Sequence, residues 1–312
     1  MKTITLSAED IREAVTMAEA IDAVRRGFID LARNEFEMPT RTVLRDGQFL
    51  VMSAHHQSSA TAMIKTLGVN FDRDPAIAGT VVWSELGRLD HLVADAGPVT
   101  MLRTGAAVGV ATDLLAVPEA SRLTVIGAGA QAPDQVRAVH SVRPLSRLIV
   151  LDADSRRAQK LITTLAPELA GVELQIATDT EAAVREAEIV CCATTATSPL
   201  FRASALPAEV HVNAIGAFRP TMRELPDDLL STSTVVIDQL DAILAESGEI
   251  IHALDSGALA KDDLTELGAA LTSPRPPAGP GGRTVFKTVG VAAQDWAIAQ
   301  LLAAKFLPVT SS

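Results

Sequence analysis

The feature that most constrains this chain is a strict alternation of apolar strand-like and helix-like segments that begins at Ser121. The expected strands lie at 123–127, 147–152, 172–177, 188–194, 210–217 and 234–239. Helical patterns fill 154–166 and 179–187 between them. Apolar strands that alternate with helices predict an α/β fold, in which a parallel sheet has helices on both faces.

A glycine-rich turn follows the first of these strands. Gly127, Gly129 and Ala132 give the pattern GxGxxA where a strand ends and a helix begins. The first glycine permits a tight turn, and the second lets the backbone approach a pyrophosphate, to which the helix N-terminus offers N–H donors. Asp152 ends the next strand, close to the spacing expected of a dinucleotide site. The segment therefore predicts a Rossmann-type dinucleotide-binding domain.

The choice of cofactor depends on Asp152. A carboxylate at this position accepts hydrogen bonds from the ribose hydroxyls and repels a 2′-phosphate, which favours NAD(H). Arg156 and Arg157 lie a turn further on. They leave NADP(H) open, although solvated helix residues are the more common interpretation of such arginines.

The first hundred residues have a different pattern. A capped amphipathic helix is expected from Ser7 to Leu31, and a helix rich in small residues at 100–117. Strand-like pieces at 41–45, 48–53, 62–70 and 79–85 are separated by turn residues. This arrangement predicts an antiparallel meander, and hence an α+β domain.

Composition excludes several classes of function. The chain has 27 Lys and Arg against 38 Asp and Glu, with 3% aromatic residues, which argues against nucleic-acid binding. The absence of Tyr excludes a tyrosine acid or base. No apolar run approaches the roughly 18 to 20 residues of a membrane span, and we expect a soluble, cytoplasmic protein. The two adjacent cysteines, Cys191 and Cys192, predict apolar packing rather than a disulfide framework or a zinc site.

Three basic residues stand in apolar segments of the first domain. Arg41, Lys65 and Arg103 occur in MPTRTVL, AMIKTLGVN and TMLRTGAAVG. A guanidinium can grip a carboxylate through two hydrogen bonds, and a lysine can protonate a nitrogen or oxygen. Taken singly, each would more often be a surface residue with a buried stem.

Several motifs together resemble the ornithine cyclodeaminase/μ-crystallin family, in an order that covers roughly residues 40 to 300. They are the segments 65–70 (KTLGVN), 100–107 (TMLRTGAA), 125–132 (VIGAGAQA), 212–217 (VNAIGA) with 223–225 (REL), 236–238 (VID), and 286–291 (FKTVGV) with Gln294 and Asp295.

This resemblance implies a homodimer with two domains and an active site in the cleft between them. Residues 1–117, joined by 290–312, would form the substrate-binding and dimerisation domain, and 118–289 the NAD-binding domain. Arg41, Lys65 and Arg103 would hold the substrate carboxylate, with Lys65 nearest the reacting nitrogen. The implied cofactor contacts are Thr80, Gly127, Gly129, Ala130, Gln131, Asp152, Thr194, Ile215 and Thr288. Val289 would line the substrate pocket.

The chain departs from the cyclodeaminases of that family at two positions. Phe218 stands where they have an aspartate that binds the amine of the substrate side chain, and Leu50 replaces a second expected acid. Neither side chain can pair with an ammonium. The remaining set resembles that of the family members that reduce a cyclic imino acid, Δ1-pyrroline-2-carboxylate or Δ1-piperideine-2-carboxylate, to L-proline or pipecolate, and this is the activity that we expect. The alternatives are an ornithine cyclodeaminase, an alanine-dehydrogenase-like enzyme and a non-catalytic binding protein.

Two other polar groups have structural interpretations. His55 and His56 lack nearby acids at ligand spacing, so we expect a loop and no metal. The acids from Asp238 to Glu249, among them Asp241 and Glu246, are expected mostly at the solvated surface or at helix ends, although Glu249 could border the cleft.

Overall fold

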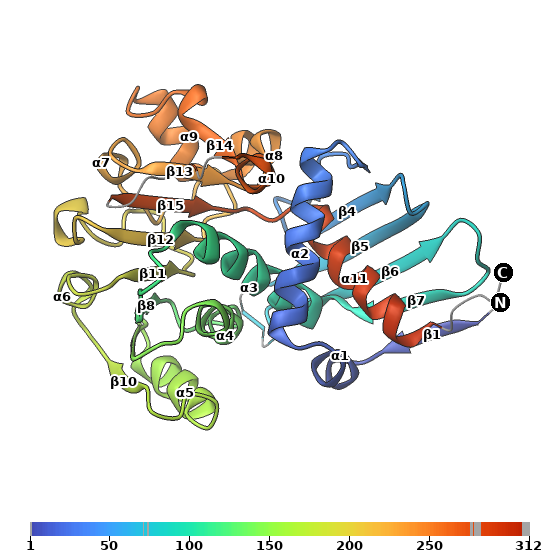
Figure 1. The fold of residues 1–312 in the computed structure, drawn as a ribbon, viewed down its shortest axis with the longest axis horizontal. Helices are drawn as coiled ribbons and strands as arrows, with labels where there is room; N and C mark the ends of the chain where they lie inside the picture. The colour runs from blue at the N-terminus through green and yellow to red at the C-terminus, as the bar shows by residue number, and fades with distance from the viewer. Residues whose placement is uncertain (1, 71, 74, 275–276, 278–281, 308–312) are drawn as a thin grey trace. The chain divides into compact units, whose positions relative to one another are not determined.

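The computed structural model describes residues 2–70, 72–73, 75–274, 277 and 282–307 (Figure 1). The chain divides into two compact units, one formed by Met1–Ala107 with Val291–Ser312 and the other by Val108–Gly290. The division falls inside helix α3 (Ala96–Leu115). The domain boundary predicted between 117 and 118 lies just beyond the end of that helix.

The first unit contains a seven-stranded sheet in the order β1-β7-β6-β5-β4-β2, with β3 also paired to β4. Its strands are β1 (Thr3–Leu6), β2 (Phe36–Glu37), β3 (Thr42–Leu44), β4 (Phe49–His56), β5 (Thr61–Val69), β6 (Ile77–Glu85) and β7 (His91–Asp95). Strands β3 to β6 form the expected antiparallel meander, and β7 extends it, whereas β1 runs parallel to β7. The sequence pattern did not predict β1 or β7, which are short.

Helices α2 (Met17–Ala32) and α11 (Ala292–Phe306) cover one face of this sheet (Figure 1). Side chains alternate along β5, so that Met63 and Leu67 are buried under the helices while Ile64 faces away and is half exposed. The two helices approach closely at Gly27, where an added Cβ would lie 3.3 Å from the Cβ of Ala297.

The single helix expected from Ser7 to Leu31 is in fact two helices. The first, α1 (Ala8–Ala14), ends at Val15, and Thr16 caps α2 in a capping box with Glu19. The break arises because this second capping box satisfies the backbone donors of a new helix start. Lys305 of α11 stabilises the two separate helix ends, because it donates hydrogen bonds to the Ala14 carbonyl and the Glu19 carboxylate, each at 2.6 Å.

The second unit is a Rossmann-type domain, as the sequence predicts. Its eight strands are all parallel, in the order β10-β9-β8-β11-β12-β15-β13-β14. They are β8 (Arg122–Ile126), β9 (Arg147–Leu151), β10 (Glu173–Ile176), β11 (Ile189–Cys192), β12 (Val210–Ala214), β13 (Thr234–Ile237), β14 (Leu264–Glu266) and β15 (Arg283–Lys287). The order of strands reverses between β8 and β11, and the carboxyl ends of strands at such a switch point are where α/β sheets bind ligands.

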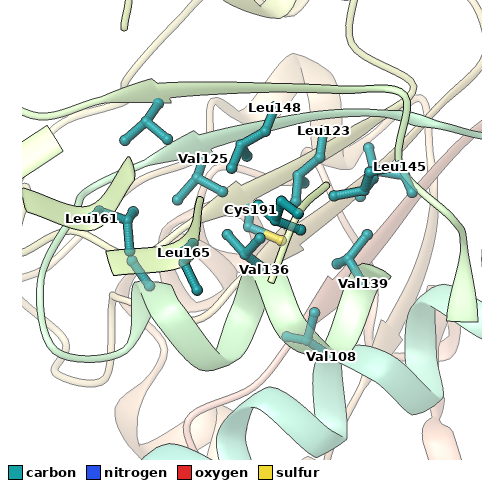
Figure 2. Close-up of a cluster of buried hydrophobic side chains, with 14 of the residues drawn as sticks. Val108, Leu123, Val125, Val136, Val139, Leu145, Leu148, Leu161, Leu165 and Cys191 are labelled. Carbon is teal, nitrogen blue, oxygen red and sulfur yellow. The ribbon is translucent and has the colours of Figure 1, made fainter. Parts of the chain in front are cut away.

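Helices separate these strands along the chain. They are α4 (Ala132–Val142), α5 (Ser155–Leu165), α6 (Thr180–Val184), α7 (Asp227–Leu230), α8 (Leu240–Glu246), α9 (Gly248–Asp255) and α10 (Leu267–Thr272), with short 3₁₀ turns at Ala203–Ala205 and Lys261–Asp263. Figure 2 shows the core on one face of the sheet, where Leu123, Leu148 and Cys191 meet Val136 and Leu165. Both cysteines are buried and free, which confirms their predicted packing role. Within the described ranges, no helix is long and apolar enough to cross a membrane.

Candidate active site

Lys65 lies in the middle of β5, on the face that α11 covers. Its neighbours on that face, Met63 and Leu67, are apolar, so the buried row of the strand carries one cation. The Lys65 ammonium donates a hydrogen bond of 2.8 Å to the Asp295 carboxylate, and both side chains are fully buried. A cation at this depth requires such a partner, because an isolated buried charge loses its hydration without compensation.

Arg103, a second residue predicted for the site, contacts the first turn of α11 and so joins the same cluster. Arg103 of α3 donates a hydrogen bond of 2.7 Å to the Gln294 side chain, and its Nε lies 3.4 Å from the Asp295 oxygen that Lys65 uses. The partial positive charge of the helix N-terminus favours a carboxylate there. Gln294 and Asp295 were named only as part of a motif and were not predicted as site residues, although an acid in the first turn of an apolar helix was an available signal.

The charges around Lys65 determine its proton affinity. Burial lowers the pKa of Lys65 from 10.5 to about 8, with Asp295 opposing the shift and the positive charges of Arg103 and Arg41 adding to it. Arg41 is half-buried and directly precedes β3. Lys65 and Arg103 therefore pair with one carboxylate, that of Asp295. The second oxygen of this carboxylate is buried and has no hydrogen-bond partner in the described part of the chain. This arrangement suits an anionic ligand that exchanges a proton with Lys65.

Two other predicted residues of this unit lie on opposite faces of the sheet. Leu50 of β4 pairs with Leu67 and packs in a small apolar cluster with Leu67 and Val69. No acid replaces it, so the row beside Lys65 stays apolar. Thr80 of β6 pairs with Thr66, is half-buried, and belongs to the face that α11 does not cover.

The glycine turn of the second unit has the features that a dinucleotide requires. Gly127 has a φ of +96°, and a Cβ added there would lie 2.5 Å from the Ala193 carbonyl oxygen, so only glycine fits. Gly129 and Ala130 are exposed, and a Cβ on Gly129 would meet no atom within 4 Å. Gln131 is the N-cap residue of α4, but its side chain makes no capping hydrogen bond, and its buried amide oxygen has no partner among the described residues. The open turn and the uncapped helix start therefore fit a pyrophosphate.

Asp152 is fixed beside that turn. Its carboxylate accepts hydrogen bonds from the Ala128 N–H at 2.7 Å and from the Asp154 N–H at 2.8 Å. Each oxygen keeps a lone pair for a ribose hydroxyl. The Arg156 guanidinium binds the Asp154 carboxylate through two hydrogen bonds of 2.9 Å, with its side chain 89% exposed, as the solvated-helix interpretation predicts.

Three further predicted cofactor contacts stand at or near the carboxyl ends of strands. Thr194 follows β11 and donates its N–H and its hydroxyl to the Glu224 carboxylate, at 2.6 and 2.8 Å. Ile215 follows β12 and is buried. Thr288 follows β15, and its hydroxyl donates to the Asp238 carboxylate at 2.6 Å.

The two predicted substrate-pocket residues of this unit follow β12 and β15. Phe218 is half-buried, and the guanidinium carbon of Arg219 lies 5.4 Å from the centre of its ring. Val289 is buried, and its N–H donates to Asp238 at 2.9 Å. Neither position provides a carboxylate.

The prediction for the acids from Asp238 to Glu249 was right about helix ends, since Asp241 and Glu249 lie in the first turns of α8 and α9 and Glu246 ends α8, but mostly wrong about exposure to solvent. Asp238, Glu246 and Glu249 are buried, and only Asp241 of the four is exposed. Asp238 accepts hydrogen bonds from the three consecutive residues 288–290, and Glu249 pairs with Lys287 at 2.8 Å. Lys287 is the last residue of β15, and residues 288–290 directly follow that strand. These partners are distant in the chain, so a local pattern of acids cannot reveal them.

The loop expected at His55 and His56 is also wrong, because β4 continues through both residues. His56 is buried and stacks on Trp296, with ring centroids 4.3 Å apart, and its Nδ1 lies 2.7 Å from the Ser59 hydroxyl. In the ranges that the structure describes, no group of three or more His, Cys, Asp or Glu side chains could hold a metal ion.

Comparison with known proteins places this arrangement in a family. The sequence profile of the ornithine cyclodeaminase/mu-crystallin family matches residues 1–307. The chain is 31% identical to a Delta(1)-pyrroline-2-carboxylate reductase of Bacillus cereus, over 96% of this chain and 95% of that protein. It is 34% identical to an L-lysine cyclodeaminase of Streptomyces rapamycinicus, over 79% and 77%.

A solved structure has a similar fold. The Delta(1)-pyrroline-2-carboxylate reductase of Thermococcus litoralis, in complex with NADH and L-proline, gives a TM-score of 0.92 at 26% identity, with 97% of each chain covered. The profile match, the curated relatives and this fold agree with the resemblance that the motifs indicated. The chain belongs to the ornithine cyclodeaminase/mu-crystallin family.

Proposed function

We propose that the chain is an NAD(H)-dependent reductase of cyclic imines that carry a carboxylate on the C=N carbon. Δ1-Pyrroline-2-carboxylate and Δ1-piperideine-2-carboxylate are the substrates that we favour, with L-proline and pipecolate as products. The observation that carries the proposal is the buried cluster of Lys65, Arg103 and Asp295, which joins a proton donor to a carboxylate-binding group. The Bacillus cereus relative is named for this activity, which supports the proposal.

The chemistry assigns a role to each charged residue. Reduction of a C=N bond adds a hydride to carbon and a proton to nitrogen. Arg103 and Arg41 would bind the substrate carboxylate and favour the iminium form in a fixed geometry. Lys65, with a pKa of about 8, is protonated at neutral pH and would supply the proton. Asp295 would hold the ammonium in place and oppose the effect of burial on its charge.

The second unit would hold the cofactor, which supplies the hydride when bound. The glycine turn and the start of α4 would bind the pyrophosphate, and Asp152 the adenine ribose. Thr80, Ala130, Gln131, Thr194, Ile215 and Thr288 complete the proposed set of contacts. NAD(H) is preferred to NADP(H) because the Asp152 carboxylate is fixed at the turn and Arg156 is paired with Asp154.

Ring closure of a diamino acid is the second candidate, and the identity with the Streptomyces protein favours it. That reaction places a second ammonium in the substrate pocket. Leu50 and Phe218 offer only hydrocarbon to it, and an ammonium desolvated without a partner loses several kcal/mol. An alanine-dehydrogenase-like activity and a non-catalytic binding role are the remaining alternatives.

One set of assays on the purified protein separates these candidates. The two cyclic imino acids are supplied with NADH or NADPH, L-ornithine with NAD, and pyruvate with ammonia and NADH. We expect oxidation of NADH with a cyclic imino acid to be fastest. Faster ornithine turnover would refute our interpretation of Phe218, and cofactor binding without any turnover would indicate a binding protein.

We further propose that the chain acts as a homodimer in the cytoplasm. Phe49, Ile64 and Val82 are 51%, 51% and 37% exposed on the face of the first sheet that α11 does not cover. An apolar sheet face of this kind suits a second copy of the chain. Light scattering should give twice the monomer mass for the parent protein and the monomer mass for Ile64→Glu. A monomeric parent protein would refute the dimer.

The free, buried Cys191 and Cys192 support the proposed location, because unpaired cysteines suit a reducing compartment such as the cytoplasm.

A further inference from the structure

Three fully buried charged side chains lie in the second unit, outside the set of residues proposed above. Glu224, Glu249 and Lys287 are each 0% exposed, and we call them the buried acid–lysine cluster. Lys287 ends β15, Glu249 is in the first turn of α9, and Glu224 lies in the segment between β12 and α7. The Lys287 ammonium pairs with the Glu249 carboxylate at 2.8 Å, and its charge also acts on Glu224.

Glu224 joins the segments that follow two neighbouring strands. One carboxylate oxygen accepts the N–H and the hydroxyl of Thr194, after β11, at 2.6 and 2.8 Å. The other accepts the N–H groups of Gly216 and Ala217, after β12, at 2.8 and 3.2 Å. Four donors therefore occupy the four lone pairs of one carboxylate.

The fit around this carboxylate is close. A Cβ added to Gly216 would lie 2.2 Å from the Thr194 carbonyl oxygen and 2.5 Å from a Glu224 oxygen, so only glycine lets the three groups meet. Lys287, the last residue of β15, links a third strand to this cluster. Its ammonium donates to the Ala217 carbonyl at 2.5 Å and lies 2.8 Å from the Glu249 carboxylate. The carboxyl ends of β11, β12 and β15 are thus held together at the edge where a parallel sheet binds its ligand.

We propose that Glu224 is a positioning residue for the dinucleotide site, holding Thr194 and the segment at 215–217 in the arrangement that binds the cofactor, and that proton uptake by the cluster loosens this hold. The inference rests on the proposed cofactor function. Glu224 acts through Thr194, Gly216 and Ala217, and reaches neither cofactor nor substrate itself.

The proton dependence follows from the groups that face Glu224. Burial and then the negative charge of Glu249 raise the pKa of Glu224 to about 7, against the effects of Lys287 and the Thr194 hydrogen bonds. The Cys192 thiol of β11, whose own pKa burial raises well above its usual value, faces the cluster in its neutral form. A proton on Glu224 takes a lone pair that a donor uses, so at least one of the four hydrogen bonds is lost.

The test measures NADH affinity directly, by fluorescence titration at pH 6, 7 and 8 without substrate. For the parent protein we expect the Kd to rise up to about tenfold from pH 8 to pH 6, since about nine-tenths of a group with a pKa of about 7 is protonated at pH 6. Glu224→Gln keeps the shape but replaces an acceptor with a donor. Its Kd at pH 8 should be about tenfold higher and should no longer depend on pH.

Glu188→Gln is the matched control. Glu188 also joins backbone N–H groups, those of Ser121 and Arg122, but at the amino end of β8. We expect its Kd and pH dependence to match the parent protein, even if its melting temperature falls.

The outcomes separate this inference from the proposed function. A folded Glu224→Gln that binds NADH as the parent does, or an equal loss in Glu188→Gln, overturns the positioning role alone. Should Glu224→Gln fail to fold, a Kd of the parent protein that is constant from pH 6 to pH 8 overturns the inference, because protonation of Glu224 must then leave the cofactor segments in place. A parent protein that binds neither NADH nor NADPH overturns the proposed function itself.

Discussion

Replacing Asp295 with Asn should move the pH at which activity is lost. In the parent protein Lys65 has a pKa of about 8 while the Asp295 carboxylate lies 2.8 Å away. A buried partner of opposite charge raises the pKa of a lysine by about 1 to 3 units, so its loss should lower the pKa of Lys65 to about 6. At pH 7 the protonated fraction then falls from about nine-tenths to about one-tenth, and kcat/KM with it by about tenfold.

The assay is the pH profile of kcat/KM for Δ1-pyrroline-2-carboxylate with saturating NADH. The substrate titrates identically in assays of both proteins, so the difference between their pH profiles reports the ionisation of groups on the enzyme. Activity that needs protonated Lys65 falls as pH rises through about 8 in the parent protein, and about two pH units earlier in Asp295→Asn. Glu19→Gln, which removes the partner of Lys305 in the same unit, should leave the profile unchanged.

The same pair predicts a change in stability. Breaking a buried ion pair costs about 3 to 5 kcal/mol, which most folded domains survive. The pKa of Lys65 is lower in the folded protein than its ordinary value of 10.5, so the unfolded chain holds this proton longer. The free energy of unfolding should therefore gain from Lys65 as pH rises from about 8 to about 10.5. An Asp295→Asn protein that is folded and keeps the parent profile would refute the role of Lys65 as the acid.

Three other substitutions test the rest of the proposed site. Gly127→Ala should lower the free energy of unfolding by about 2 kcal/mol or more, through its φ of +96° and the contact with Ala193, whereas Gly129→Ala should leave urea unfolding nearly unchanged. Asp152→Ser removes the repulsion of a 2′-phosphate, so the ratio of NADPH to NADH efficiency should rise at least about tenfold, and an unchanged ratio would contradict the assigned ribose contact. Phe218→Asp should raise the KM for the cyclic imine, and equal KM values in the two proteins would exclude Phe218 from the pocket.

The Rossmann-type unit was the part that sequence could predict well. Its central strands β8, β11 and β12 are short, mostly apolar runs, and Gly127 marks the turn by a backbone conformation that only glycine adopts readily. The three-residue β14, LTE, lacks such a pattern and was not predicted. Such signals depend on only a few neighbouring residues, and the structure contains the strands and the turn that they predict. The split of the first helix at Thr16 was also a local signal, a Thr with Glu three residues later, which the longer apolar periodicity concealed.

The charged groups were harder to predict because their partners are distant in the chain. Lys65 was singled out as a cation in an apolar strand, but its partner Asp295 is 230 residues away. Glu249 looked like part of a solvated acidic stretch because Lys287 is not near it in sequence. A buried charge is stabilised by what the fold brings beside it, so its residue type alone cannot separate a surface position from a paired interior one.

The last helix has a consequence for synthesis of the protein. Once residues up to 290 have emerged from the ribosome, the second unit is complete and can bury its core. The sheet of the first unit still lacks α11, so Met63 and Trp83 have no cover from that helix and the Lys65 ammonium has no counter-ion. The first unit can therefore complete its fold only after the residues that follow 290 have been synthesised. A nascent chain stalled before Val291 should expose that sheet face to chaperones while its Rossmann-type unit resists proteolysis.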